Sequence, residues 1–505
     1  MDLTTMLEST AHKFPHKQAV VAGETALTYD ELLAASRRAA AVLRDAGVTR
    51  GDHVGVMTYN TPAFVVAAFG IWRAGAVLVP LNHKFASPEV AYVARHAGIR
   101  LGVVDAELAP TARADTPATR WLVTAPDGTG DFDAAVAAAA PWDGVAVDDT
   151  EIAELLYTSG TVSEPKGCLH SHRGIHTVAA YTTATMGLRP TDRFLISMPI
   201  WHASPLNNWF LSMMFVGGTV VLQREYQPIE FLQTVARARV TAFFGAPIAY
   251  LAPLAATAAA GVDMDSVDLS SVRAWIYGAA PLGAQTVRRL QQAYRSDAFY
   301  QVYGMTEMGP VGTALYPEDQ VAKAGSVGAG GMPGVDVRVM GPDGVPVRPG
   351  EAGEVWIRSD TRMVGYLDDP QATAAAFEGP WYKTGDVAVV DEDGYLFIVD
   401  RLKDIVITGG ENVFSPEVEE ALLQHPHIRD AAVVGRPHPE WGETVVAVVV
   451  TDGTPLTLAD VREFLVPRLA RYKIPRELVI RDALPRNPSG KITKHVLRRE
   501  VGAAR

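Results

Sequence analysis

The sequence has almost no cysteine and no long apolar run. Cys168 is the single cysteine among 505 residues, which excludes an internal disulfide and suits a reducing compartment. The most apolar stretch, residues 206–222, is interrupted by two asparagines and two glycines, so it does not read as a membrane span. The N-terminal residues lack the basic-then-apolar order of a signal peptide. We therefore expect a cytoplasmic protein without membrane insertion.

The sequence is also short of positive charge. It has 45 basic and 57 acidic residues, for a formal net charge of −12. This balance argues against proteins that bind nucleic acid or anionic membranes. Hydrophobic residues make up 48% and charged residues 20%, an ordinary globular mixture. The length is too great for one simple core and indicates two or three units.

The first third of the chain alternates between helical and strand patterns. A helix is predicted over residues 30–46: Thr28 and Glu31 form a capping box, Gly47 ends the helix, and four residues share one face, namely Leu32, Ser36, Ala39 and Leu43. A strand over 52–58, a helix over 63–75 and a strand over 76–81 follow. Repeated units of this kind predict parallel sheets covered by helices.

The pattern of predicted secondary structure changes in the later segments. The alanine-rich residues 133–144 predict a surface helix, and short strands with Gly, Pro and Asp turns begin at about residue 325. Near residue 401 an α+β pattern begins, with helices predicted over 415–426 and 458–470. The predicted fold is α/β, with a large N-terminal domain, 1–400, of mixed, mainly parallel sheets flanked by helices plus a β-rich subdomain. A small α+β domain, 401–505, follows it.

The first chemical signal is the segment YTSGTVSEPKG at 157–167. Its hydroxyls, glycine and lysine offer N–H, O–H and ammonium donors that suit a polyphosphate. The spacing excludes a Walker A motif, because Pro165 stands where the second glycine belongs and Gly167 follows the lysine. A dinucleotide fingerprint is excluded as well, because Pro333 replaces the last glycine of the cluster at 328–334.

Five more motifs follow in order along the chain: YGMTE at 303–307, YKTGD at 382–386, DRLKD at 400–404, GGEN at 409–412 and PRNPSGK at 485–491. With the opening loop, this set resembles the adenylate-forming, AMP-binding superfamily over essentially the whole chain. Further segments are most similar to its acyl- and aryl-CoA ligases: GAAPL at 278–282, ITGGENVFSPEVEE at 407–420 and RYKIPRE at 471–477.

The resemblance implies that a carboxylate attacks the α-phosphate of ATP and that CoA then takes the acyl group. Because two anions approach each other, catalysis is mainly positioning and charge neutralisation. Glu307 is implied to bind Mg²⁺, Thr306 to touch the α-phosphate, and Lys491 to reach both the α-phosphate and the substrate carboxylate. Tyr303 would stack on adenine, and Asp386 would accept both ribose hydroxyls, with Arg401 nearby. The implied nucleotide-binding residues are Thr158, Ser159, Gly160, Thr161, Lys166, Gly278, Ala279, Ala280, Tyr303, Gly304, Thr306, Asp386, Arg401 and Lys491.

The resemblance also implies an acyl pocket and a moving C-terminal domain. His202 takes the place of a gate beside the thiol tunnel and is counted with the catalytic residues. The pocket residues are Trp201, His202, Asn207, Trp209, Gly245, Gly278, Gly304 and Met305. No aspartate sits there to hold an α-amino group, which favours a hydrophobic acyl or aryl carboxylate. Gly409, Gly410 and Glu411 would line the CoA path, and Lys403 would be the hinge within 401–403.

The opening loop departs from the family pattern, because Val162 and Ser163 replace a hydroxylated residue and a glycine. Two alternatives therefore stay open beside CoA ligation. One is transfer of the acyl group to a carrier protein or a nitrogen nucleophile, and the other is nucleotide binding without turnover. A homodimer is also left open. The histidines at 170, 172 and 176 lack a completing Cys or carboxylate nearby, so we interpret them as structural rather than zinc ligands.

Overall fold

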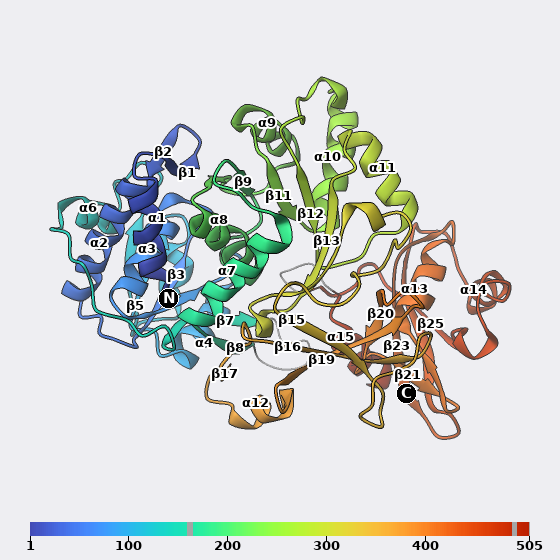
Figure 1. The fold of residues 1–505 in the computed structure, drawn as a ribbon. Coiled ribbons are helices and arrows are strands. Elements are labelled where there is room, and N and C mark those ends of the chain that lie inside the picture. The colour runs from blue at the N-terminus through green and yellow to red at the C-terminus, as the bar shows by residue number, and fades with distance from the viewer. Residues whose placement is uncertain (159–164, 487–491, 504–505) are drawn as a thin grey trace. The chain divides into compact units, whose positions relative to one another are not determined.

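A computed structural model describes residues 1–158, 165–486 and 492–503 (Figure 1). The chain divides into two compact units. The first consists of residues 1–158, 166–337 and 357–382, and the second contains residues 338–356 and the chain from 383 onward. The architecture is mixed α/β, as predicted. The predicted domain boundary at 400/401 and the hinge at 401–403 stay predictions.

One sheet of the first unit has eight strands, and its six central strands run parallel. The carboxyl ends of these strands therefore meet at one edge, and an antiparallel strand closes each side. The order is β14 (Gly312–Leu315), β13 (Phe299–Gly304), β12 (Ala274–Tyr277), β11 (Ala242–Gly245), β9 (Arg193–Ile196), β10 (Thr219–Leu222), β1 (Gln18–Ala22) and β2 (Thr25–Thr28).

The other sheet of this unit has seven strands. Five strands are parallel to one another. The last of these five pairs with an antiparallel neighbour, and one short further strand, antiparallel to that neighbour, forms the edge of the sheet. The order is β17 (Gly365–Tyr366), β8 (Lys166–Ser171), β7 (Ile152–Thr158), β4 (Val77–Pro80), β3 (His53–Met57), β5 (Leu101–Asp105) and β6 (Arg120–Thr124). The predicted strands at 52–58 and 76–81 are β3 and β4.

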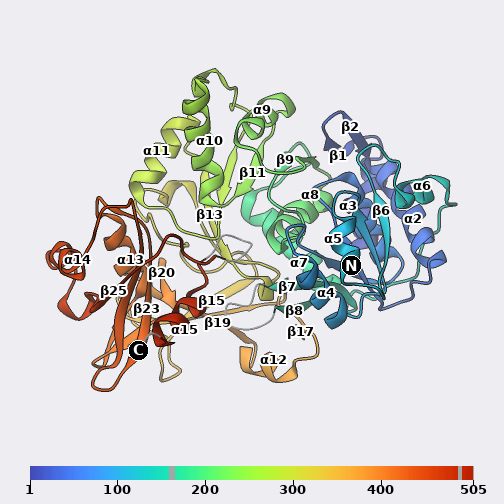
Figure 2. The same ribbon diagram turned by 180° about the vertical axis from the view of Figure 1, so that it is seen from behind.

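Helices cover these sheets. Figure 1 shows α10 beside β11 and β12, and Figure 2, the view from behind, shows α5 beside β6. The helices are α1 (Leu3–Lys13), α2 (Tyr29–Asp45), α3 (Pro62–Arg73), α4 (Ser87–His96), α5 (Ala109–Ala114), α6 (Asp131–Ala138), α7 (His172–Met186), α8 (Leu211–Val216), α9 (Pro228–Ala238), α10 (Pro247–Ala260), α11 (Ala284–Tyr294) and α12 (Pro370–Ala376). A π-helix, η1 (Ser204–Phe210), runs directly into α8.

Local sequence signals explain where several helices begin and end. The capping box of Thr28 and Glu31 starts α2, and the four residues predicted to share one face are all fully buried. Helix α6 is shorter than the predicted 133–144, because Pro141 disfavours helical backbone in the residue before it. Helix α14 (Leu458–Leu465) also ends before the predicted residue 470, close to Pro467.

The β-rich subdomain predicted from about residue 325 is confirmed. A five-stranded sheet has the order β15 (Val335–Met340), β16 (Ala352–Ser359), β19 (Trp381–Val390) and β18 (Phe377–Glu378), with β20 (Leu396–Arg401) also paired to β19. A last sheet has the order β22 (Glu411–Val413), β21 (Val406–Thr408), β24 (Gly442–Thr451) and β23 (Ile428–His438), and β25 (Glu477–Ile480) pairs with β24.

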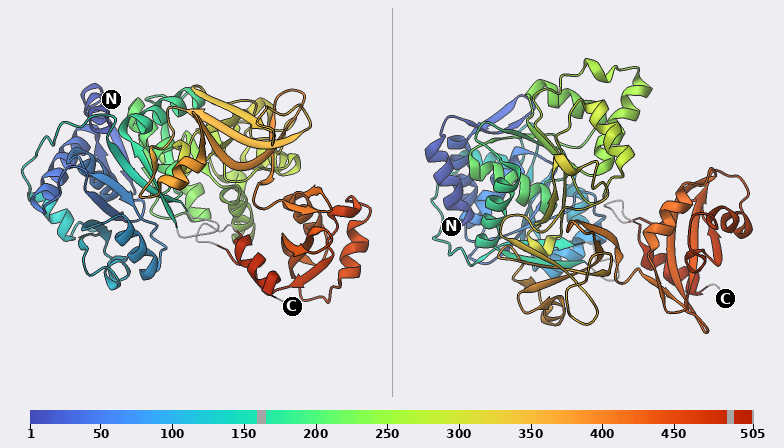
Figure 3. Two further views of the ribbon diagram at one scale, coloured as in Figure 1. Left: turned by 90° about the horizontal axis from the view of Figure 1, so that it is seen from below. Right: turned by 45° about the vertical axis from the view of Figure 1, so that its right-hand side comes forward.

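This last sheet is buried on both faces. Along β23, Ala431 and Val433 belong to one apolar cluster, whereas Ala432 and Val434 belong to another, as the alternation of strand side chains requires. Helices α13 (Ser415–Leu423) and α15 (Lys494–Ala503) both pack against β23. Figure 3 shows these orange and red elements from two further sides. The α+β character predicted for the C-terminal segment is confirmed.

None of the helices in the described part of the chain is long and apolar enough to cross a membrane.

Candidate functional site

The β7–β8 hairpin brings the two ends of the predicted phosphate loop together. Thr158 and Lys166 are register partners, and the Thr158 hydroxyl donates to the Lys166 carbonyl at 3.4 Å. The loop therefore leaves and re-enters the sheet at one point on its edge. The predicted binding residues Ser159, Gly160 and Thr161 lie outside the described residues.

Lys166 presents a cation beside this hairpin. Its ammonium lies 3.8 Å from a carboxylate oxygen of Asp369 and 4.9 Å from the ring centre of Tyr366. The Lys166 and Asp369 side chains are 40% and 43% exposed, so water screens their attraction and the ion pair is weak. Little free energy would then be lost if an anionic ligand drew the ammonium away from Asp369.

Glu307 lies in the short 3₁₀ turn η3 (Thr306–Met308), directly after β13. The Tyr366 hydroxyl donates to Glu307 Oε1 at 3.0 Å. Burial raises the pKa of the Tyr366 phenol, and the negative charge of Glu307 raises it further. Tyr366 therefore stays a hydrogen-bond donor at neutral pH and holds the Glu307 carboxylate in one orientation.

Tyr366 connects the two predicted phosphate-binding elements. It belongs to β17, where it pairs with Cys168 of β8, so its ring lies against Lys166 while its hydroxyl reaches Glu307. A loop-anchoring lysine and a carboxylate from distant parts of the sequence thus meet at one aromatic side chain. Such a pairing of positive and negative groups suits the phosphates and divalent cation of a nucleotide.

The remaining predicted residues of this unit follow the carboxyl ends of neighbouring parallel strands. Gly245 ends β11, Gly278 follows β12, and Gly304 ends β13. Ligands bind at this edge in open α/β sheets. Trp201 and His202 follow β9 in the same sheet, with ring centres 5.6 Å apart. The structure therefore brings together along one edge the predicted residues Trp201, His202, Gly245, Gly278, Ala279, Ala280, Tyr303, Gly304, Met305 and Thr306.

Two backbone features at this edge limit which residues fit there. A Cβ on Gly304 would lie 2.8 Å from the Pro310 carbonyl oxygen, so glycine is required for this close approach. Ala279 has a φ of 70°, a left-handed conformation that costs a non-glycine residue free energy. Strained backbone of this kind clusters at ligand sites.

Two predicted pocket residues are buried in the π-helix η1. Trp209 is 1% exposed and stacks on both Phe194 and Phe244, with ring centres 5.2 Å apart in each pair. Asn207 is fully buried, and its amide donates to Glu154 Oε1 at 2.6 Å and to the Gly309 carbonyl at 3.0 Å. A π-helix is rare and often marks a functional segment.

In the second unit, Asp386 and Arg401 are register partners on β19 and β20. Arg401 Nε lies 3.0 Å from Asp386 Oδ1, and the Asp386 side chain is only 9% exposed. The Arg401 carbonyl accepts hydrogen bonds from the Asp404 and Ile405 amides at 2.8 and 3.1 Å, which forms the turn that contains Lys403. The resemblance implies that Arg401 lies near Asp386, and the structure places the two side chains together. Their contact with a ribose stays a prediction.

The glycines predicted to line a CoA path form a tight turn. Gly409 and Gly410 connect β21 to β22 with φ values of 61° and 84°, and Thr408 pairs with Glu411 across the turn. Positive φ at both central residues is typical of a two-residue hairpin and favours glycine. The turn accounts for the glycines, and their place on a CoA path stays a prediction. Lys491 lies outside the described residues.

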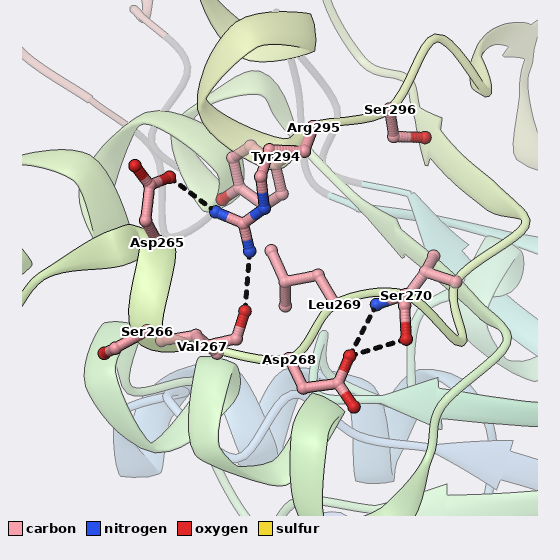
Figure 4. A pocket seen from close by; sticks show the side chains of 10 residues that line it. Asp265, Ser266, Val267, Asp268, Leu269, Ser270, Tyr294, Arg295 and Ser296 are labelled. Atoms are coloured by element: carbon pink, nitrogen blue, oxygen red, sulfur yellow. Dashed lines mark hydrogen bonds and ion pairs between the residues drawn. The ribbon is translucent and has the colours of Figure 1, made fainter.

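The surface depression in Figure 4 contains none of the predicted residues. Its charged groups are engaged with their neighbours: Arg295 donates to Asp265 at 2.8 Å and to the Val267 carbonyl at 2.6 Å, and Asp268 accepts from Ser270. These groups are engaged with one another, and no residue of the predicted site lies among them.

Sequence reasoning missed Tyr366, Asp369 and Glu154. The first two lie in the segment GYLDD at 365–369, which only the pairing of β17 with β8 brings to the phosphate loop. No local pattern predicts that pairing. Glu154 did carry a signal, because it is a lone acid inside the otherwise apolar strand IAELLYT.

Residues 7–367 match the family of AMP-binding enzymes, and residues 417–491 match the AMP-binding enzyme C-terminal domain. The chain belongs to the AMP-binding enzyme family. Among its AMP-binding relatives, feruloyl-CoA synthase of Amycolatopsis sp is 39% identical and covers 97% of each chain. The long-chain-fatty-acid–CoA ligase FadD13 of Mycobacterium tuberculosis is 34% identical over 99% of this chain and 98% of its own.

A solved structure of the family agrees with the fold of this AMP-binding enzyme. ATP-bound MatB from Rhodopseudomonas palustris has a TM-score of 0.87 and 30% identity, and the match covers 100% of this chain and 99% of MatB. Together these likenesses over the whole chain make the protein an AMP-forming acyl-CoA synthetase, as the ordered motifs predicted. ATP and CoA are the substrates that the family implies. The roles of single residues stay predictions.

A tyrosine-to-phenylalanine change tests the contact between Tyr366 and Glu307. Tyr366→Phe removes only the hydroxyl, and a hydrogen bond to a charged group stabilises by about 1.5–3 kcal/mol. We expect the KM for ATP to rise by about tenfold, while the KM for the carboxylate stays within about twofold. Steady-state pyrophosphate release measures both constants. Tyr316→Phe, on a tyrosine after β14, is the matched control, and equal constants in Tyr366→Phe and the wild type would contradict the assignment.

Proposed function

We propose that this protein activates a hydrophobic acyl or aryl carboxylate with ATP and transfers the acyl group to CoA. The observation that carries the proposal is the meeting of Lys166 and Glu307 at Tyr366, directly beside the ends of the loop at 158–166. A lysine and a carboxylate so placed match the needs of a bound polyphosphate and its divalent cation. The relatives' printed names, for an aryl and a long-chain acyl substrate, support the substrate class.

In the first half-reaction, a carboxylate oxygen of the substrate attacks the α-phosphorus of ATP, and pyrophosphate leaves. The product is an acyl-adenylate, a mixed anhydride. We assign Lys166 and the loop donors to the β- and γ-phosphates, Thr306 to the α-phosphate, and Asp386 with Arg401 to the ribose. Lys491 neutralises charge between the two reacting anions, which is where preorganised donors lower the barrier most.

Magnesium fits the residues at the Glu307 turn. The Tyr366 hydroxyl donates a hydrogen bond to Glu307 Oε1 and so orients the carboxylate. Carboxylate and phosphate oxygens are the hard ligands that Mg²⁺ prefers. When bound, the ion would neutralise phosphate charge and orient the leaving group. We therefore assign Glu307 to Mg²⁺.

In the second half-reaction, the CoA sulfur attacks the acyl carbonyl carbon, the thiol proton is lost, and AMP leaves with the anhydride oxygen. We assign Gly409, Gly410 and Glu411 to the path of the pantetheine arm and Lys403 to the hinge. His202, after β9, stands between the acyl pocket and this path in the proposal.

A pyrophosphate-release assay over a panel of carboxylates, with and without CoA, tests the proposed function. We expect turnover with hydrophobic acids and the acyl-CoA product by mass spectrometry. Turnover without an acyl-CoA product would instead favour transfer to a carrier protein or a nitrogen nucleophile. ATP binding without pyrophosphate release for any acid would favour a protein that binds nucleotide only.

The aromatic stack around Trp209 predicts a change in substrate preference. Phe244 stacks on Trp209 and lies 3.1 Å from the position of a Cβ on Gly278, so it reaches the predicted pocket wall. Phe244→Leu should enlarge the pocket and shift the kcat/KM ratio by about fivefold or more toward the bulkier of two acids. Competition between the two acids measures this ratio.

Phe299 is the matched control, because it begins β13, at the end of the strand away from the predicted pocket, and packs in the core with Trp275 and Tyr294. Phe299→Leu should lower the melting temperature and leave the ratio unchanged. The pocket assignment is wrong if both variants shift the ratio equally.

A further inference from the structure

A buried acid lies in the middle of β7, and among residues 1–158, 165–486 and 492–503 no ion pair reaches it. Glu154 is fully buried between its strand neighbours Leu78 and His170. Its Oε1 accepts from Asn207, and Oε2 finds no hydrogen-bond partner within the described parts of the chain. Burying an acid in an apolar strand destabilises the fold unless the group is neutral and hydrogen-bonded. Because the Glu154 side chain does not reach water, a role in solubility does not explain why an acid stands at this position.

The buried surroundings of Glu154 keep its carboxyl group protonated at neutral pH. Burial raises the pKa of its carboxyl to about 8, and the hydrogen bond from Asn207 opposes only part of this rise. His170, directly opposite on β8, is also fully buried, and burial lowers its pKa to about 4, so it supplies no positive charge. At neutral pH, Glu154 is thus mainly an acid whose Oε1 accepts one hydrogen bond.

That one hydrogen bond orients Asn207. The same amide nitrogen donates to Glu154 Oε1 at 2.6 Å and to the Gly309 carbonyl at 3.0 Å, which uses both N–H groups. With one N–H engaged by Glu154, the other points at Gly309. The next residue, Asn208, donates to the Pro310 carbonyl at 3.1 Å. Two adjacent amides of η1 therefore hold the chain immediately after the turn that carries Glu307.

Contacts from another segment also hold this turn. Thr361 Oγ1 donates to the Met308 carbonyl at 2.8 Å, and the Met363 amide donates to the Glu307 carbonyl at 2.7 Å; both residues lie between β16 and β17. The turn is thus held by two sets of contacts, a first cluster of Thr361 and Met363 and a second cluster of Asn207 and Asn208 in η1. Removing the Glu154 acceptor would release the second cluster only, because Asn207 could then rotate.

We propose that Glu154 is a positioning residue for the reaction: it fixes the Asn207 amide, which holds the Thr306–Gly309 turn and thereby the Glu307 carboxylate. This inference rests on the proposed role of Glu307 toward Mg²⁺. A purely structural polar pair would also stabilise the fold. Its loss would lower the melting temperature, but it would not act selectively on hydrogen exchange in the Glu307 turn or on the Mg²⁺ midpoint.

Two readouts on the full chain test the inference. The first is hydrogen–deuterium exchange of the peptide spanning residues 303–311 without nucleotide, since the Met308 and Gly309 amides donate within this turn at 2.9 and 3.0 Å. The second is the Mg²⁺ concentration for half-maximal pyrophosphate release at fixed ATP. Glu154→Leu and Asn207→Asp remove the acceptor and the donor respectively, and Glu154→Gln keeps an acceptor at Oε1.

We expect Glu154→Leu and Asn207→Asp to speed exchange in the 303–311 peptide and to raise the Mg²⁺ midpoint, each by about tenfold, the size of one lost buried hydrogen bond. The KM for the carboxylate in Glu154→Leu should stay within about twofold, and Glu154→Gln should match the wild type within about threefold in both readouts. If Glu154→Leu does not fold, the comparison of Asn207→Asp with Glu154→Gln decides.

The inference is overturned if Glu154→Gln is as damaged as Glu154→Leu, or if exchange and the Mg²⁺ midpoint stay unchanged in Asn207→Asp. Glu307→Gln separates this failure from failure of the proposed function. A Mg²⁺ midpoint that Glu307→Gln leaves unchanged rejects the role of Glu307 itself. A midpoint that moves in Glu307→Gln but not in Asn207→Asp rejects only the positioning role.

Discussion

Replacing Lys491 with alanine is expected to lower the rate of acyl-adenylate formation by about 10²-fold or more, the usual cost of removing one preorganised donor from developing charge. The same variant should convert a supplied acyl-adenylate and CoA into thioester at close to the wild-type rate, because the lysine serves only the first half-reaction in this proposal. Single-turnover assays of each half-reaction measure the two rates separately.

Lys403→Pro is the control for Lys491→Ala, because it is expected to affect the other half-reaction. Proline fixes φ and restricts the residue before it, so the turn between Arg401 and Asp404 becomes stiffer. Adenylation should continue, whereas thioester formation slows, because in the proposed cycle the C-terminal domain rotates between the two steps. Equal loss of both half-reactions in Lys491→Ala, with circular dichroism unchanged, would rule out a two-conformation cycle for this chain.

Replacing Asp386 with alanine should raise the KM for ATP by about 10²-fold, since two charge-assisted hydrogen bonds to the ribose would each contribute about 1.5–3 kcal/mol. The preference for ATP over 2′-deoxy-ATP should fall in the same variant, because one of the lost bonds is to the 2′-hydroxyl. Initial rates of pyrophosphate release with each nucleotide measure both effects.

Asp391→Ala is the matched control for this change. Asp391 accepts from the Asp393 and Tyr395 amides in the turn after β19, so its loss should lower the melting temperature without changing the nucleotide preference. A folded Asp386→Ala variant with wild-type KM values for both nucleotides would remove Asp386 from the nucleotide site.

Much of the fold was predictable from local signals. The capping box at Thr28, the buried face of α2 and the strands β3 and β4 all follow from short-range chemistry and apolar spacing. The helices at 131–138 and 458–465 were predicted too long, because alanine content and apolar spacing outweighed the nearby prolines in the interpretation. Helix ends depend on single residues, whereas helix existence depends on many.

The candidate site was predictable only in part. The resemblance carried by the ordered motifs implied roles for Lys166, Glu307, Asp386 and Arg401, and these roles stay predictions, although the structure does place Arg401 beside Asp386. Tyr366 was not predicted, because its importance depends on the pairing of β17 with β8, which brings together segments far apart in the chain. Asn207 was predicted as a pocket residue, yet its amide contacts Glu154 and Gly309, a pair of contacts that only the tertiary packing defines.

The π-helix η1 has a consequence for how related chains can diverge. A π-turn contains one residue more than the α-helical turn it replaces, so losing a single residue between Ser204 and Phe210 would let the segment become α-helical and continue into α8. Such a deletion would rotate the residues before it by about 100° about the helix axis. A deletion before Trp209 would leave its stacking on Phe194 and Phe244 in place and would turn the earlier side chains, such as that of Asn207, toward other neighbours. If this segment lines the acyl pocket as proposed, a one-codon deletion would change the substrate specificity, and comparisons that consider substitutions alone would overlook it.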